Sequence, residues 1–313
     1  MNLRKAIIQT RMTIIMQNIL NLGVEIIQTI QQIHNPALDT FFKGITSLGG
    51  GEVYILLLPL FFWCVDTSLG AHAGLVFLVS SYFANGLKDL FRQPRPFQIE
   101  PVVKLGDAEG YGLPSFHALE ATVMWGMFAV WLKRPWFWIL AVSMMVLIGF
   151  SRIYLGVHFP TDVLAGFAIG VLFLWIYATG GSTLERWLKG LPFKWQVVLS
   201  VAIPVMLAIS HPSDDVILIM SALSGFCLGL ALFNRYLSFS AAGPIWQRIT
   251  RFLVGDIVIL LLYIAPRLFS VAGLEAYHSP LRFLHYSVVG FWITFGGPWL
   301  FRRLRLAGPA DAA

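Results

Sequence analysis

Charged residues are scarce in this sequence. Only 12% of its 313 residues are Asp, Glu, Lys or Arg, whereas 57% are hydrophobic. Soluble domains carry about 25% charged residues, so the composition argues against a water-soluble globular protein and for one whose surface faces lipid. Cysteine is scarcer still, since Cys64 and Cys227 are the only two and both lie within apolar segments. A disulfide framework and a cysteine-based metal site are therefore not expected.

The N-terminal region lacks the features of a cleaved signal peptide. The stretch 12–34 has no A-x-A-like cleavage site and is interrupted by amide side chains. Its polar residues recur at steps of three and four, which predicts a narrow polar stripe on an otherwise apolar helix. The stripe consists of Asn18, Asn21, Glu25, Gln28 and Gln32. Such a helix either lies in the membrane interface or crosses with its stripe turned inward, and we favour the interface.

Long apolar runs dominate the rest of the chain. A helix needs roughly 20 apolar residues to cross the hydrocarbon core, and nine segments approach that length. They are predicted at 45–65, 71–91, 115–133, 136–155, 159–179, 196–211, 214–234, 252–270 and 284–301. The sixth is short and contains Pro204. The predicted fold class is all-α, a polytopic transmembrane helical bundle of about nine spans plus an N-terminal amphipathic helix.

This pattern divides the chain into three parts. Residues 1–44 form the N-terminal amphipathic, interfacial segment, 45–180 a helical core that holds all the conspicuous polar clusters, and 181–313 four additional transmembrane helices. The stretch 92–114 is predicted to be a long connection without regular structure, rich in Pro and Gly. Loops of this length are commonly functional, so it is a candidate lid or substrate entrance, with a plain tether as the alternative.

The net charge of +6 has two readings. Nucleic-acid binding is rejected, because the basic residues lie in short loops between apolar spans rather than on one soluble face. Membrane sidedness fits better, since cytoplasmic loops collect Lys and Arg. In the nine-span prediction most basic residues outside the clusters lie on the side opposite to them. The expected protein is therefore a multi-pass integral membrane protein of the plasma, inner or reticulum membrane, with its clusters on the periplasmic or lumenal face.

Three polar clusters interrupt the apolar pattern between residues 88 and 162. The first contains Lys88 and Arg95, the second Ser115, Phe116 and His117, and the third Arg152, His158 and Asp162. Each cluster lies at the end of an apolar stretch. Inserting a charged side chain at mid-bilayer costs about 2.5–3.5 kcal/mol. A cation at the end of a span costs less but still calls for an anion beside it. Arg pairs with phosphate through a planar fork and Lys through a point charge, so the clusters predict a phosphate-handling site.

The eight residues divide into two predicted roles. Lys88, Arg95, Ser115, Arg152 and the backbone N–H of Phe116 are expected to hold phosphoryl oxygens at the start of a helix, where anions bind well. Asp162 follows His158 by four residues and shares its helical face. A carboxylate on one imidazole nitrogen leaves the other free as a nucleophile. His117 is then expected to act as general acid and base. No metal or cofactor is expected.

The clusters resemble the signature of the type 2 phosphatidic acid phosphatase family. That signature reads Lys-x6-Arg-Pro, Pro-Ser-Gly-His and Ser-Arg-x5-His-x3-Asp, and the match covers about 75 residues in the same order. The resemblance implies a phosphohistidine on His158, acid–base work by His117 and support of the nucleophile by Asp162. Phe116 departs from the family, because it stands where glycine is usual.

A narrower resemblance points to the sphingosine-1-phosphate phosphatase branch. It is carried by Pro101 to Lys104, Tyr111, Pro114 to Ala118 and Ser151 to Gly156. It implies hydrolysis of a lipid phosphate monoester, with a sphingoid-base phosphate as a candidate substrate. A polyprenyl pyrophosphate phosphatase and a lipid phosphotransferase remain alternatives within the same chemistry.

A lipid transporter or flippase remains the alternative from another class. Asp256, alone inside a predicted span, would suit it, whereas an activated nucleophile would not. The expected partners are a lipid phosphate and membrane lipids, and the sequence leaves the oligomeric state open. For three further charged residues a plain structural or surface role is as well supported by the sequence as a functional one. They are Arg92, Lys104 and Glu120.

Overall fold

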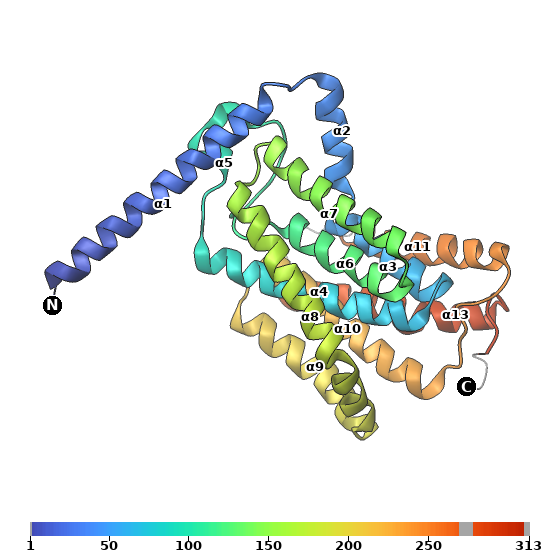
Figure 1. Ribbon diagram of the computed structural model, residues 1–313. Coiled ribbons are helices and arrows are strands. Elements are labelled where there is room, and N and C mark those ends of the chain that lie inside the picture. Colours follow the sequence, from blue (N-terminus) through green and yellow to red (C-terminus); the bar gives the residue numbers. More distant parts are fainter. Residues whose placement is uncertain (1, 269–277, 310–313) are drawn as a thin grey trace. The chain divides into compact units, whose positions relative to one another are not determined.

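The computed structural model describes residues 2–268 and 278–309. Its regular elements are helices (Figure 1): α1 Asn2–Gln31, α2 Pro36–Ser47, α3 Gly51–Cys64, α4 Thr67–Phe91, α5 Pro96–Ile99, the short 3-10 helix η1 Pro101–Val103, α6 Phe116–Leu132, α7 Pro135–Tyr154, α8 Pro160–Gly190, α9 Phe193–Ser210, α10 Asp214–Tyr236, α11 Ile245–Leu268, α12 His278–Phe291, the π-turn η3 Trp292–Gly296 and α13 Gly297–Arg303. The predicted all-α class is confirmed.

The helices pack as two compact units. The first unit consists of residues 1–50 and 86–172, and the second of residues 51–85 and 173–313. Two long helices, α4 and α8, each contribute one end to each unit. These units are defined by packing and each combines separate stretches of the chain. The predicted division into the consecutive parts 1–44, 45–180 and 181–313 rests on the sequence pattern and stays a prediction.

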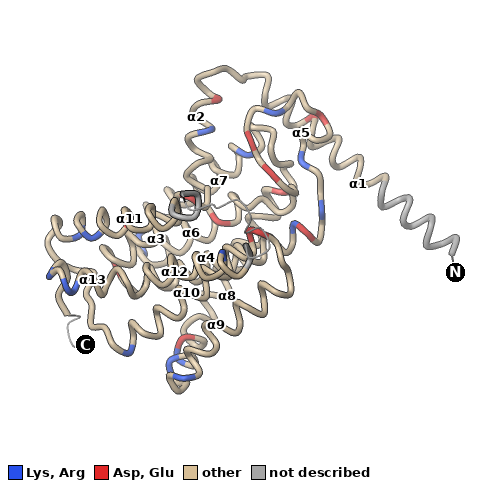
Figure 2. Tube along the Cα trace, turned by 180° about the vertical axis from the view of Figure 1, so that it is seen from behind, with Lys and Arg blue, Asp and Glu red and all other residues tan. Residues whose placement is uncertain are grey.

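Fewer helices than predicted have the length and composition of a membrane span. Among the described residues these are Thr67–Ile99, α7, α8, α9 and α10, with a sixth if α2 and α3 together form one broken span. The predicted span 45–65 is interrupted because α2 ends at Ser47 and α3 begins at Gly51. Figure 2 shows charged residues gathered mostly at helix ends and loops.

Three further predicted spans also depart from the expected form. α6 has only 17 residues, and the last predicted span, 284–301, is divided among α12, the π-turn and α13. α11 carries four charged residues, Arg248, Arg251, Asp256 and Arg267. The count of nine spans is therefore not confirmed for the described chain.

The stretch 92–114 is not structureless, and that prediction was wrong. It contains α5 and η1. Arg95 precedes α5, and its backbone N–H donates to Oε1 of Gln98 at 2.7 Å. Val103 at the end of η1 is fully buried. Proline, which suggested a loop, instead begins each short helix, since its fixed φ suits the first helical position.

The N-terminal helix ends shortly before Asn35 and Pro36, a pair of residues that predicts a helix stop. α1 ends at Gln31, and Asn35 caps α2 by accepting the backbone N–H groups of Ala37 and Leu38, each at 3.1 Å. Pro36 occupies the first turn of α2, as is common in helices. The helix begins earlier than expected, at Asn2 rather than near residue 12.

Small residues bring the three polar clusters of the first unit together. A Cβ atom on Gly166 of α8 would lie 2.6 Å from the backbone oxygen of Ser115, and one on Gly170 would lie 2.6 Å from Cβ of Thr122 in α6. Close helix approach through small residues is typical of membrane proteins. The first turns of α6 and α8 consequently lie side by side, and the N–H of Ser115 donates to the backbone oxygen of Asp162 at 3.0 Å.

Aromatic packing and small residues hold the second unit together. The indole of Trp63 is fully buried, donates to the backbone oxygen of Ile293 at 2.7 Å and packs on Gly255. α10 and α12 meet closely, because a Cβ on Gly225 would lie 1.8 Å from the backbone oxygen of Ser287. The guanidinium of Arg251, also fully buried, donates to the backbone oxygens of residues 240–242.

Gly156 is the residue of the first unit that most strictly requires glycine. Its φ is +69°, and a Cβ there would lie 1.8 Å from the backbone oxygen of Val103. Side chains rarely adopt this backbone conformation. The glycine lets the chain turn after α7, two residues before His158.

We therefore expect Gly156→Ala to destabilise the folded protein by more than about 1 kcal/mol, because it adds a steric clash to backbone strain. Thermal unfolding in detergent measures the change. The matched control is Gly44→Ala in α2, where a Cβ would meet nothing within 4 Å and where alanine favours the helix. Equal melting temperatures for the two variants would contradict this reading of the turn.

Candidate functional site

All eight residues predicted for the site lie in the first unit. Lys88 is in the last turn of α4, Arg95 precedes α5, Ser115 caps α6, Phe116 and His117 begin α6, Arg152 is in the last turn of α7, His158 lies in the loop between α7 and α8, and Asp162 is in the first turn of α8. Helix ends thus supply nearly all of them. Their places along the chain differ, but one compact unit contains them.

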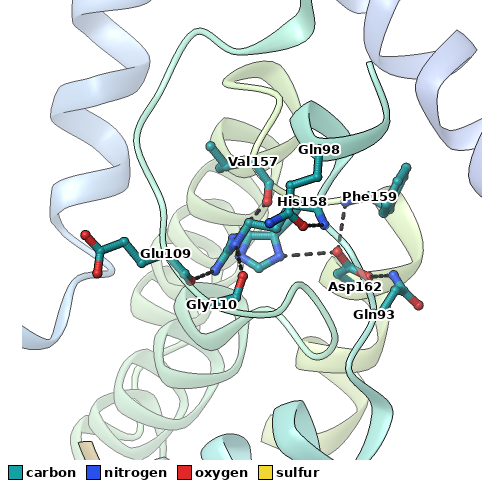
Figure 3. A network of polar contacts seen from close by, with 9 residues as sticks. Gln93, Gln98, Glu109, Gly110, Val157, His158, Phe159 and Asp162 are labelled. Atoms are coloured by element: carbon teal, nitrogen blue, oxygen red, sulfur yellow. Dashed lines mark hydrogen bonds and ion pairs between the residues drawn. The ribbon is translucent and has the colours of Figure 1, made fainter. Parts of the chain in front are cut away.

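His158 and Asp162 form a buried pair. The imidazole is 1% exposed and the carboxylate fully buried, and Nδ1 of His158 lies 3.3 Å from Oδ2 of Asp162 (Figure 3). The same Oδ2 accepts the backbone N–H of Phe159 at 3.0 Å. Because a carboxylate only accepts hydrogen bonds, the proton of the neutral imidazole belongs on Nδ1. Nε2 therefore carries the lone pair.

Gln93 holds the other carboxylate oxygen. Its Nε2 donates to Oδ1 of Asp162 at 2.5 Å, and Figure 3 shows the amide and the imidazole on different sides of the carboxylate. A Cβ on Gly112 would lie 2.9 Å from Oδ2, so glycine leaves room for the carboxylate. Gln93 has no signal in the sequence, because it falls among the six unspecified positions between Lys88 and Arg95.

Arg95 is held mainly by the backbone. Its Nε donates to the oxygen of Gly110 at 2.9 Å, Nη2 to that of Glu109 at 2.6 Å and Nη1 to that of Val157 at 2.9 Å. Nη1 also lies 3.1 Å from Nε2 of His158. Four of the five N–H donors of the guanidinium therefore have protein partners. The carbonyl partners had no sequence signal, since any residue supplies a backbone oxygen.

The electrostatic surroundings of His158 favour the neutral imidazole. Burial is the largest cause, and the positive charges of Arg95, Arg152 and Lys88 follow; together they lower the pKa of His158 well below its usual range. The charge of His117 acts on the same ring. These interactions show that the three clusters converge electrostatically on one imidazole.

Two buried donors near this imidazole lack partners among the described residues. They are Oγ of Ser115 and Nε of Arg152. Ser115 is fully buried and makes no side-chain cap to α6, whereas Nη1 of Arg152 donates to Oγ1 of Thr46 at 2.7 Å. Buried polar atoms are normally satisfied. A hydroxyl at the start of α6 and a guanidinium at the end of α7, each with an unused donor, fit an anion such as phosphate.

Phe116 and His117 begin α6 beside the remaining cation. Nζ of Lys88 lies 5.7 Å from the centroid of the Phe116 ring, within the range of a cation–π interaction. The ring centroids of Phe116 and His117 are 6.3 Å apart. A Cβ on Gly49 would lie 3.5 Å from the His117 side chain. The aromatic residue that departs from the family pattern therefore contacts a predicted phosphate ligand.

The other charged candidates lie in ordinary surroundings. Nε of Arg92 donates to the backbone oxygen of Asp89 at 3.0 Å, and Lys104 forms an exposed ion pair with Asp107. Glu120 is fully buried one turn after His117. Asp256 is in the second unit, where neither carboxylate oxygen has a partner among the described residues. Among residues 2–268 and 278–309, no group of three or more His, Cys, Asp or Glu side chains is arranged to hold a metal ion.

Comparison with known proteins gives two separate matches to family models, with residues 187–216 between them. The model described as PAP2 superfamily matches residues 69–186, and the model described as PAP2 superfamily phosphatase, transmembrane extension, matches residues 217–309. The first match includes all eight candidate residues. The second covers most of the helices that follow α8.

Individual relatives are named for phosphatase activity. The chain is similar to lipid phosphate phosphatase delta of Arabidopsis thaliana, at 32% identity over 52% of this chain and 43% of that protein. It is similar to sphingosine-1-phosphate phosphatase 1 of Rattus norvegicus, at 24% identity over 87% of this chain and 74% of that protein. Phosphatidylglycerophosphatase B of Bacillus subtilis is 31% identical over 49% of this chain and 80% of that protein. The chain thus spans less than half of the plant relative.

The lowered pKa makes a direct prediction for His158. Its imidazole should stay neutral when the pH falls through about 6.5, the usual pKa of histidine, and should keep the proton on Nδ1. NMR of the 15N-labelled protein in detergent measures both, with His158→Asn to assign the signal. Because the unfolded chain binds this proton more readily, the folded state should lose stability as the pH falls below about 6.5. A His158 signal that titrates at or above that pH would contradict the prediction.

Proposed function

We propose, from the premise that this chain belongs to the PAP2 superfamily of membrane lipid phosphatases, that it hydrolyses a lipid phosphate monoester through a phosphohistidine on His158. The observation that carries the proposal is the orientation of that imidazole. Asp162 holds its Nδ1, and its Nε2 lies next to Arg95. Transport of a lipid headgroup needs cations but has no use for an oriented imidazole.

The phosphate would bind where unused donors remain. Oγ of Ser115 and Nε of Arg152 supply two of them, and the first N–H groups of α6, including that of Phe116, supply more because a helix start leaves them unpaired. Lys88 adds a point charge. Arg95 has fewer donors to offer, since the backbone takes most of them. Its Nη1 lies 3.1 Å from Nε2 of His158 and would turn to a phosphate oxygen when the substrate binds, which frees the lone pair of Nε2 and stabilises charge on the transferring group.

In the first step, Nε2 of His158 attacks the phosphorus atom as the bond from phosphorus to the lipid oxygen breaks. Asp162 stabilises the positive charge that develops on the imidazole, through the Nδ1–H hydrogen bond. His117 enters this step protonated, with the bound phosphate dianion offsetting its charge, and donates that proton to the departing oxygen, so the lipid leaves as an alcohol. Gln93 keeps Asp162 in place during this change, because it holds the carboxylate oxygen that His158 does not contact.

In the second step, water replaces the imidazole on phosphorus. His117, now neutral, takes a proton from that water, whose oxygen bonds to phosphorus while the bond between phosphorus and nitrogen breaks. Inorganic phosphate is released and both histidines return to their starting states. If a lipid alcohol took the place of water, the phosphoryl group would be transferred to that lipid. The residues of the site are compatible with either acceptor, water or a lipid alcohol.

A sphingoid-base phosphate is the substrate class that we favour. The relative named for sphingosine-1-phosphate aligns with 87% of this chain. The other two named relatives align with about half of it. Phe116, a residue with a bulky ring beside Lys88, further distinguishes this site from the usual glycine pattern.

A substrate panel tests the activity. Purified protein in detergent with a chelator is given a sphingoid-base phosphate, a diacylglycerol phosphate, a phosphatidylglycerol phosphate and a polyprenyl pyrophosphate. Free phosphate and phosphate transferred to an added lipid alcohol are measured separately. We expect free phosphate, released fastest from the sphingoid-base phosphate. Transfer without release would favour the phosphotransferase, and neither product from any substrate would favour lipid transport.

His158→Asn should lower phosphate release by at least about 10³-fold, because removal of a covalent nucleophile leaves only binding and charge stabilisation. The variant should elute as a folded protein and still bind the lipid phosphate. His34→Asn is the matched control, since that side chain is 54% exposed and its Nδ1 lies 3.7 Å from Oδ2 of Asp39. Phosphate release by His158→Asn at the rate of His34→Asn would end the covalent mechanism.

We place the site on the periplasmic or lumenal face, as the distribution of basic residues favours. Asp107 provides a probe, because its side chain is fully exposed. In Asp107→Cys, a membrane-impermeant thiol reagent should label intact bacteria after outer-membrane permeabilisation, or sealed vesicles with the lumenal face outward. The unmodified chain is the control, since Cys64 and Cys227 are buried or partly buried. Labelling only after the membrane is opened would put the site on the cytoplasmic face.

A further inference from the structure

α1 packs against both flanks of the loop that carries His158. Leu20, Val24 and Ile27 on one face of α1 are buried with Val103 of η1 and Phe159, the residue that follows His158. A Cβ on Gly23 would lie 2.6 Å from the ring of Phe159, so glycine lets the helix approach this ring closely. Figure 1 shows α1 passing beside α5. The downstream end of the loop therefore rests on α1.

Gln31 holds the upstream end of the same loop. Its Nε2 donates to the backbone oxygen of Tyr154 at 2.7 Å and to that of Val103 at 2.8 Å. Tyr154 is the last residue of α7. One amide thus joins the end of α7 to η1 across a turn that already brings Gly156 against Val103. With Phe159 on the far side, α1 restrains the loop at two points around the imidazole.

The faces of α1 that do not touch the protein differ sharply in polarity. At about 100° per residue, the polar stripe and an apolar stripe lie roughly 120° from the buried face and from each other. Both stripes are exposed. The polar stripe is Asn18, Asn21, Glu25, Gln28 and Gln32, and the apolar stripe is Ile15, Ile19, Leu22, Ile26 and Ile33. A helix with protein on one side, polar groups on the second and isoleucine and leucine on the third fits the membrane–water interface.

We propose that α1 is a lipid-docked brace for the reactive imidazole, with Gln31 as a positioning residue for His158. The occupant of the apolar stripe is the bilayer interface, because one unpartnered stripe of a helix in a membrane protein is apolar while its neighbour is polar. Gln31 touches no substrate; it acts through the backbone of residues 154–159. The proposal rests on the proposed phosphatase function, since its consequence is the rate of attack by His158.

Gln31→Leu tests the brace. It keeps the approximate size of the side chain and removes both hydrogen bonds. We expect kcat to fall about 10- to 100-fold, the cost of a nucleophile displaced by roughly 1 Å, while KM changes less than about threefold because the phosphate ligands stay. Gln32→Leu is the matched control, being an exposed amide one position along the same helix.

Gln31→Glu provides a readout that a purely structural role would not give. At neutral pH the carboxylate cannot donate to the oxygens of Tyr154 and Val103, but its protonated form donates once. The ratio of its kcat to that of the wild type should therefore rise as the pH is lowered toward about 4.3, the usual pKa of glutamate. A flat ratio, with Gln31→Leu as active as Gln32→Leu, overturns the brace.

Two double variants test whether the apolar stripe of α1 docks on the lipid. Leu22→Gln with Ile26→Gln makes the apolar stripe polar, and Asn21→Ala with Gln28→Ala alters the polar stripe equally. For the first pair we expect the fold-loss of kcat, relative to the wild type, to be at least about five times larger in lipid vesicles than in detergent micelles. The second pair should lose the same fraction of kcat in both media. Equal effects of both pairs in vesicles overturn the docking. Wild-type protein without phosphate release sinks the proposed function itself, whereas an active wild type with unaffected variants sinks this inference alone.

Discussion

The site depends on keeping positive charge buried next to a neutral imidazole. Arg95 and Arg152 are 3% and 5% exposed, and a buried charge is costly unless hydrogen bonds and opposite charge offset the lost solvation. Backbone oxygens from the loop 109–110 and from Val157 surround Arg95. Arg152 and Ser115 instead retain unused donors. Within the described residues one guanidinium is thus nearly satisfied, whereas the other keeps a donor that the proposed function assigns to the phosphate.

This asymmetry refines the roles expected from the sequence. All the cations of the signature were assigned to phosphate oxygens, yet Arg95 lies 3.1 Å from Nε2 of His158 and is tied to the loop. Arg95 therefore contacts the proposed nucleophile directly, in addition to its proposed place in the phosphate site. Asp162 has a corresponding double support, from Gln93 on one oxygen and from the N–H of Phe159 on the other. Rigid support of this kind is how a site holds reactive geometry.

The sequence predicted the helical class, the end of α1 and the set of polar clusters because each depends on local pattern or on charged residues in apolar surroundings. It could not predict Gln93, Thr46 or the carbonyls of residues 109–110, since amides, hydroxyls and backbone oxygens are common everywhere. It mistook α5 and η1 for a loop because proline counts against regular structure. Its count of nine membrane spans is not confirmed for the described residues, because α6 is short, α11 carries charged residues and α12 is followed by a break in the helix.

The central claim is that the phosphoryl group passes through Nε2 of His158. Its most direct measurement is mass spectrometry of the protein quenched in alkali during turnover of a lipid phosphate, where phosphohistidine survives. A phosphoryl group on the peptide that contains His158, and its absence from the peptide that contains His117, is the predicted result. A phosphoryl group on His117, or active protein with no phosphorylated histidine at any time of quenching, would contradict the claim.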